Sequence, residues 1–264
     1  MVYRLCVLTL SAITLIACQG TEKSRPVPRT PFPESRADNF NLGGLVWISK
    51  FEKTAEFPGY QGIYLSKDGR LLLINFPDAI GDRWEIQGNL LSLSFLQGAP
   101  ELLNTPLTHR LRIVVEIVED GLPKHIRLIP EHGGDTMGAS LIRGTAEVDL
   151  VENYWLLKKL IGTEKISRPS DAEIHMILLP GENGLGILGY GGVNRFRGDV
   201  EFGDELFKVG SLKTGTLMNN PYLDFENRYV SGLAKVNRYV QVDFNLFLYS
   251  DTTPVVAFRA RMFN

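Results

Sequence analysis

The sequence predicts a mainly β protein made of two small antiparallel β-barrel-like modules, the second of which contains one α-helix. Three observations support this prediction. Short apolar runs bounded by turn residues recur between residues 42 and 142, a second series begins near residue 148, and one stretch near 221–236 has helical periodicity. Many short strands at regular spacing favour closed barrels or sandwiches, because closure removes exposed sheet edges.

The first series of runs predicts eight strands. They are expected near 44–51, 61–66, 70–75, 83–87, 90–95, 110–118, 124–130 and 138–142. The segments 67–70, 87–89 and 119–121 combine glycine with Asn or Asp. These residues accept the positive φ that hairpin turns require, so the strands are expected to pair as antiparallel neighbours.

The second series predicts a module of the same kind with a helix near its end. Strands are expected near 153–160, 172–179, 184–189, 195–202, 205–209, 239–249 and 254–261. Asn219-Asn220-Pro221 supplies a helix start, and the apolar residues after it recur every three or four positions up to Val236. Trp47 and Trp155 each lie in the strand that opens a module, which is a sign of two related units.

The first residues are typical of an export signal. One basic residue, Arg4, precedes an apolar run over 5–17. This run is too short to span a bilayer, which needs roughly 20 apolar residues, and fits a signal-peptide core. The run ends in Leu15-Ile16-Ala17-Cys18, which resembles the lipobox of bacterial lipoproteins. That resemblance implies cleavage before Cys18 and lipidation of its sulfur, whereas an ordinary cleaved signal would leave Cys18 incidental.

The lipid anchor and the residues after it define the expected layout. Two or more acyl chains hold a protein stably on a membrane. Gln19, where an aspartate would stand in retained lipoproteins, points by the same resemblance to the periplasmic face of the outer membrane. The four prolines between residues 20 and 38 indicate an extended tether. The expected segments are a signal peptide at 1–17, lipidated cysteine and tether at 18–39, and modules at 40–145 and 146–264.

Cysteine content and charge exclude some classes of function. Cys6 and Cys18 are the only cysteines, so the folded part has no disulfide and depends on packing. The formal net charge is −2 with both signs scattered along the chain. No basic face for nucleic acid is evident, and no nucleic-acid partner is expected.

The second module resembles the META domain, also called HslJ-like. The resemblance covers about residues 148 to 262 and rests on Gly191-Gly192-Val193-Asn194-Arg195-Phe196-Arg197-Gly198 together with the order of the surrounding elements. The residues that carry it are Trp155, Gly191, Gly192, Asn194, Phe196, Gly198, Thr216 and Met218. The first module resembles the lipocalin-like β-domains found beside META domains, although it has no sharp motif.

The chain departs from the family pattern at two cysteine positions. Val193 stands before Asn194 where that family has cysteine, and the second cysteine is replaced in the 219–220 region. Any function that relies on this sulfur pair is therefore absent. The resemblance implies envelope maintenance or stress tolerance, with the motif residues in a structural role, and implies no enzymatic activity.

No motif predicts a metal, a cofactor or a catalytic residue. The four histidines, His109, His125, His132 and His175, lack the paired spacing of metal ligands. The glycine-rich stretch 181–192 lacks the Gly-Lys-Ser/Thr that opens a phosphate loop. The acidic stretch 199–205 lacks the spacing of a calcium loop and is expected to be a charged strand face neutralised by Arg195 and Arg197.

Two classes of function remain open. The first is a non-enzymatic binding and stress-tolerance module that takes a partner protein or an apolar small molecule. The large apolar residues of the first module favour a filled core, hence a protein partner; they are Trp47, Trp84, Phe95, Leu73 and Ile74. The alternative is a hydrolase of envelope polymers that uses Asp78, Asp82 and Glu85. It requires two carboxyl groups about 5–10 Å apart in a cleft.

Overall fold

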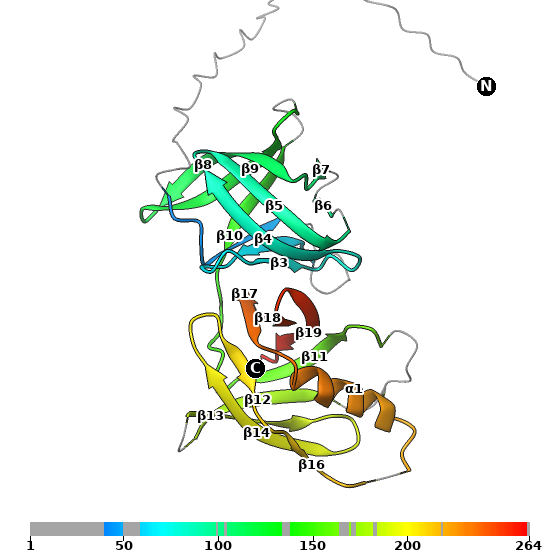
Figure 1. Cartoon of the computed structure of the whole chain (residues 1–264). Coiled ribbons are helices and arrows are strands. Elements are labelled where there is room, and N and C mark those ends of the chain that lie inside the picture. Colours follow the sequence, from blue (N-terminus) through cyan, green and yellow to red (C-terminus); the bar gives the residue numbers. More distant parts are fainter. Residues whose placement is uncertain are drawn as a thin grey trace, which may run out of the picture. The chain divides into compact units, whose positions relative to one another are not determined.

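Two large antiparallel sheets and a separate two-stranded sheet, β6-β7, make up the described part of the computed structural model of the chain (Figure 1). It describes residues 40–49, 59–98, 100–102, 105–133, 138–163, 169, 173–181, 184–217 and 219–262. The expected signal peptide, Cys18 and the tether therefore lie outside the described residues. Among the described residues, no helix has the length and apolarity needed to cross a membrane.

The first sheet is an eight-stranded barrel with the order β3-β2-β1-β10-β9-β8-β5-β4. Its strands are β1 (Leu45–Ser49), β2 (Gly62–Leu65), β3 (Leu71–Ile74), β4 (Ile80–Gln87), β5 (Leu90–Gln97), β8 (Arg110–Glu119), β9 (Leu122–Pro130) and β10 (Ala139–Gly144). The two end strands meet where Arg70 bridges Arg83, and the Trp84 backbone N–H donates to the Gly69 carbonyl at 2.9 Å. These contacts nearly close the sheet into a barrel, which confirms the predicted barrel-like fold.

Side chains fill the first barrel. Trp47 and Leu73 lie in its buried core, and Trp84 and Phe95 pack against that core while partly exposed. Ile74, expected in the same core, is buried in a different cluster on the outside of the barrel. The reason is strand alternation, because neighbouring residues such as Leu73 and Ile74 point to opposite faces.

The second sheet closes in the same manner, with the order β15-β14-β13-β12-β11-β19-β18-β17 and β16 paired to β14. Its strands are β11 (Tyr154–Leu160), β12 (His175–Gly181), β13 (Gly184–Tyr190), β14 (Arg195–Phe202), β15 (Phe207–Val209), β16 (Lys213–Thr214), β17 (Arg238–Val242), β18 (Asn245–Ser250) and β19 (Thr253–Ala260). Leu206 bridges Arg238, and the Phe207 N–H donates to the Asn237 carbonyl at 3.2 Å, which joins the end strands.

The single helix of the described residues, α1 (Leu223–Leu233), belongs to this second barrel. Phe225, Tyr229 and Leu233 are buried in the barrel's core, as their spacing predicts. The helix begins two residues later than expected. The Asn220 side chain accepts the Tyr222 N–H at 2.9 Å, which stabilises the turn before the helix, and the N-cap itself is Tyr222 without a side-chain cap.

The prediction of one strand over 239–249 is wrong, because two strands, β17 and β18, occupy this range. β17 and β18 form a hairpin whose turn places Asp243 at φ 50°. Asp tolerates this left-handed conformation, but no glycine marks the turn in the sequence. The short strands β6 (Glu101–Leu102), β7 (Thr105–Pro106) and β16 were also not expected, since two residues carry no periodicity.

A third buried cluster joins the two barrels inside the compact unit formed by residues 33–264. Its members come from the outer faces of β1 to β3 and of β17 to β19. They are Val46, Ile48, Tyr64, Leu72, Ile74, Val240, Val242, Phe247, Tyr249 and Ala257. The Tyr249 hydroxyl donates to the Leu73 carbonyl at 3.1 Å across this cluster. Each barrel thus has its own core, and a further apolar contact fixes one barrel to the other.

Candidate functional site

The turn between β13 and β14 surrounds a buried carboxylate from α1. Glu226 is 3% exposed. It accepts the backbone N–H groups of Val193, at 2.9 Å, and of Asn194, and the Asn194 side-chain amide at 2.7 Å. A buried carboxylate is stable only when its oxygens are hydrogen-bonded. These three donors satisfy it, so the turn and the helix are locked together.

The Asn194 side chain also reaches the segment that follows β16. Its Oδ1 accepts the Leu217 N–H at 3.0 Å. Thr216 beside it is exposed, while Met218 lies outside the described residues. One amide therefore holds the turn, the helix and the strand-to-helix connection.

The glycines of the turn are needed for close packing. A Cβ on Gly191 would lie 2.7 Å from Glu226 Cγ, and one on Gly198 would lie 2.8 Å from Leu212 Cδ2. Gly192 has φ +109°, which side-chain-bearing residues rarely adopt. Gly191 therefore leaves the space that the Glu226 carboxylate occupies, while Gly198, inside β14, leaves space for Leu212.

The two aromatic residues of the motif lie in the core. The Trp155 indole N–H donates to the Leu150 carbonyl at 2.9 Å, and Phe196 packs edge-on against Tyr229 with ring centroids 5.6 Å apart. Val193, in place of the family cysteine, is buried, and Asn219 is exposed with φ 64°. The described motif residues therefore contact each other and the core, and no cleft among those described below is lined by them.

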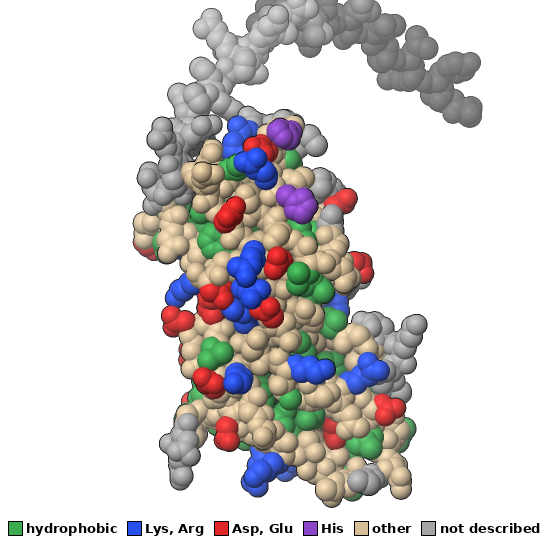
Figure 2. Space-filling model, viewed as in Figure 1, with side chains coloured by type: hydrophobic (Ala, Val, Ile, Leu, Met, Phe, Trp, Pro, Cys, Tyr) green, Lys and Arg blue, Asp and Glu red, His purple; other side chains and the backbone are tan. Residues whose placement is uncertain are grey.

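A charged groove, which we call the junction groove, lies where β17 meets the turn after β2. It has a volume of about 460 Å³ and is lined by Lys67, Asp68, Asp204, Glu205, Leu206, Asn237 and Arg238. Arg238 lies within ion-pair distance of Asp68, of Glu205 at 3.8 Å and of Asp251 at 3.7 Å. Figure 2 shows the same mixture of signs on the face in view, where blue and red side chains adjoin.

Among the groove carboxylates, Asp68 is held in its charged form. Burial alone would raise the pKa of Asp68, but hydrogen bonds from Ser66 and Arg238 and the charge of Arg238 hold that pKa below its ordinary value. The Tyr64 hydroxyl donates to Glu205 at 2.8 Å. A general acid needs a raised pKa, so Asp68 does not suit that role.

The sequence did not predict this grouping. Asp204 and Glu205 were expected to be neutralised by Arg195 and Arg197, but they pair with Lys67 and Arg238. These partners are far apart in the sequence, so only the fold reveals them.

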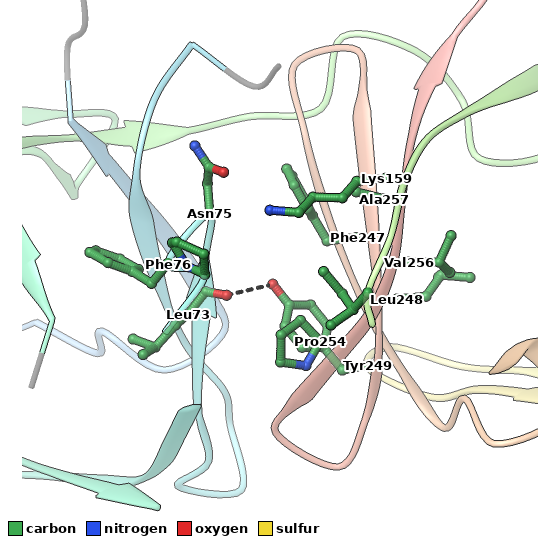
Figure 3. Close-up of a pocket in the computed structure, with 12 residues that line it drawn as sticks. Leu73, Asn75, Phe76, Lys159, Phe247, Leu248, Tyr249, Pro254, Val256 and Ala257 are labelled. Carbon is green, nitrogen blue, oxygen red and sulfur yellow. Dashed lines mark hydrogen bonds between the residues drawn. The ribbon is translucent and has the colours of Figure 1, made fainter. Parts of the chain in front are cut away.

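The carboxylates of the hydrolase alternative lie elsewhere. Asp78 and Glu85 are exposed, and Asp82 accepts the Ser94 hydroxyl and lies 3.9 Å from Arg70. None of the three lines the junction groove or the apolar pocket of Figure 3. Neither of these two clefts therefore supplies the pair of carboxyl groups that the hydrolase alternative requires.

The apolar pocket in Figure 3 lies beside the cluster that joins the barrels. Phe247, Tyr249 and Ala257 lie on one side of it, and the strand end with Leu73, Asn75 and Phe76 lies on the other. The Leu73 and Phe76 side chains point away from the pocket, and the Lys159 side chain extends toward Asn75. Its volume is about 50 Å³, whereas sites for small organic ligands usually measure roughly 300–1,000 Å³. It therefore accommodates only a very small molecule.

The histidines do not gather into a site. No group of three or more His, Cys, Asp or Glu residues among the described positions could hold a metal ion. His175 instead stacks on Tyr154 with ring centroids 4.1 Å apart, and its Nδ1 lies 2.6 Å from the Tyr154 hydroxyl. His109 Nδ1 lies 3.1 Å from the Leu93 carbonyl.

The second barrel of this mainly β chain carries the motif residues, and it is the part that matches a known family. Residues 148–262 match the family model described as the META domain. No curated protein matches the chain. A solved structure described as "NMR structure of the protein from Burkholderia xenovorans" matches with 20% identity and a TM-score of 0.35, over 43% of this chain and 85% of that one.

Proposed function

We propose that this chain is a lipid-anchored lipoprotein of the outer membrane that faces the periplasm and acts there as a non-enzymatic binding and stress-tolerance module. The anchor and the location rest on the sequence around Cys18 and Gln19. The binding role rests on the META match and on how the fold uses its motif residues.

The binding role is supported mainly by one observation: the described motif residues use their polar groups and side chains to stabilise the fold. Glu226 and Asn194 satisfy one another and the neighbouring backbone, so neither has a free group to offer to a substrate. The apolar pocket is too small for most ligands, and side chains fill the first barrel. Recognition is therefore assigned to the outer surface, which favours a partner protein over an apolar small molecule.

One experiment separates this proposal from the hydrolase alternative. Intact envelopes that contain the wild type or the triple variant Asp78→Asn/Asp82→Asn/Glu85→Gln are crosslinked, and adducts are purified through this chain. We expect the same protein adduct from both, together with full complementation of a deletion strain under envelope stress. A folded triple variant that retains the adduct but fails to complement would contradict the proposal and favour the hydrolase.

A further inference from the structure

The outer surface of the META barrel is covered on one side and open on the other. Outward residues of β17 to β19, such as Phe247 and Tyr249, are buried in the cluster shared with the first barrel. Outward residues of β11 to β14 have no such cover among the described residues. We call this second surface the β11–β14 face. It consists of Tyr154, Leu156, His175, Ile177, Leu179, Leu188, Tyr190, Arg195 and Arg197, with Lys213, Arg259 and Arg261 at its edges.

Strand pairing arranges these residues in rows, because cross-strand partners point to the same side of a sheet. One row is Arg259, Leu156, His175, Tyr190 and Arg195, and the next is Tyr154, Ile177, Leu188, Arg197 and Lys213. The middle of the face is thus aromatic and aliphatic, and basic residues flank it on β14, β16 and β19.

The apolar residues of this face are accessible. Leu179 is 37% exposed and Leu188 is 38% exposed. At the β19 edge the Arg261 guanidinium lies 5.9 Å from the centre of the Tyr154 ring, and Met262 beside it is 61% exposed. The other apolar and aromatic residues of the two rows are half-buried. Exposed apolar residues beside half-buried aromatic ones, with a charged border, are typical of an interaction surface.

The basic residues at the β14 edge are not neutralised by neighbours. Arg195, Arg197 and Lys213 are exposed and form no ion pair among the described residues. Carboxylates do occur at the border. Glu173 pairs with Arg261, and Asp199 and Glu201 lie farther along β14, the latter 4.0 Å from Lys208. The face is therefore apolar at its centre and net basic at the β14 edge.

We propose that the β11–β14 face docks on an anionic phospholipid surface. Arg and Lys are attracted to anionic headgroups, and Tyr with aliphatic side chains favours the interfacial region. This inference rests on the proposed lipid anchor, because the chain outside the described residues contains Cys18. Anchoring raises the effective concentration of that surface, so modest affinity suffices.

Vesicle cosedimentation tests the docking directly. The protein is the chain from residue 18 with Cys18→Ser, which keeps the whole compact unit and lacks lipid. We expect it to bind vesicles of equal parts phosphatidylglycerol and phosphatidylcholine and to dissociate from them in high salt. It should not bind vesicles of phosphatidylcholine alone. The variant Arg195→Glu/Arg197→Glu/Lys213→Glu should bind more than about tenfold less tightly.

A second triple variant is the matched control. Arg83→Glu/Arg228→Glu/Lys235→Glu changes the net charge by the same amount at exposed sites on other elements. It should weaken binding much less, and circular dichroism should show both variants folded. Equal weakening by the two variants, or no binding of the parent to anionic vesicles, overturns the proposal.

Two further results keep the docking and the anchor distinct. Palmitate labelling of Cys18 without vesicle binding leaves the anchor in place and overturns the docking. Vesicle binding without labelling supports the docking and contradicts the anchor. A photocrosslinker at Leu188 that yields only protein adducts, with no vesicle binding, would assign the face to a protein partner and overturn the membrane assignment.

Discussion

Asn194 connects three parts of the META barrel, because its backbone and side chain bond to Glu226 of α1 and its Oδ1 accepts the Leu217 N–H after β16. Replacement by alanine keeps the backbone bond but removes both side-chain bonds, which leaves the buried Glu226 Oε1 short of a donor and the Leu217 N–H without this acceptor. An unpaired buried polar group costs roughly 1–3 kcal/mol. We expect Asn194→Ala to lower the melting temperature by several degrees.

The control for this change is Val193→Cys, which should have little effect because its partner position is no longer cysteine. Thermal unfolding and in-cell complementation are measured together for both variants. If Asn194→Ala melts like the parent and still fails to complement, Asn194 belongs to a binding or active site and the structural interpretation of the motif is wrong.

Tyr229 differs from Asn194 because its buried polar group forms no hydrogen bond with the described residues. Its hydroxyl is buried in the core of the META barrel with no hydrogen-bond partner among the described residues, and burial raises its pKa well above the ordinary value. Removal of an unpaired buried hydroxyl is neutral or stabilising. Tyr229→Phe should therefore melt at the same temperature as the parent or higher, and a clear decrease would show that the hydroxyl has a partner.

At the scale of elements, Asp68 in the junction groove should make the free energy of unfolding depend on pH. Because its pKa is lower in the folded chain than the ordinary 3.8, folding favours the charged carboxylate. The stabilisation is fully present above the unfolded pKa and is lost as pH falls below it through the folded value. Chemical unfolding from neutral to strongly acidic pH should show this loss, and Asp68→Asn should reduce it. An identical acid dependence in the two proteins would exclude Asp68 as a source.

Element positions were predictable where periodicity or turn residues marked them. Leu91, Leu93 and Phe95 alternate with serines, and the strand they predict is β5. The β17–β18 hairpin escaped prediction because Asp243 takes a positive φ without glycine beside it. The contact between Glu226 and the turn at Val193 and Asn194 was not predicted either, because Glu226 occupies an ordinary polar position in the sequence of the helix. Its partners lie more than 30 residues earlier.

At the scale of the whole molecule, stability should come from packing alone. Two barrel cores and the cluster between them contain the large apolar residues, and no cysteine remains after Cys18. We expect residues 39–264 to fold without lipid or disulfide as a monomeric, β-rich protein. Circular dichroism dominated by random coil or by helix would contradict this expectation, and sedimentation would report the oligomeric state.

The central claim is that the chain works from a lipid anchor, and labelling with palmitate tests it most directly. Cells that express the wild type or Cys18→Ser are grown with labelled palmitate, and the envelope is fractionated. The account predicts label in the wild type, found with the outer membrane, and an unlabelled precursor or mislocalised chain for Cys18→Ser. A wild type without label, or Cys18→Ser that still takes up label, would contradict it.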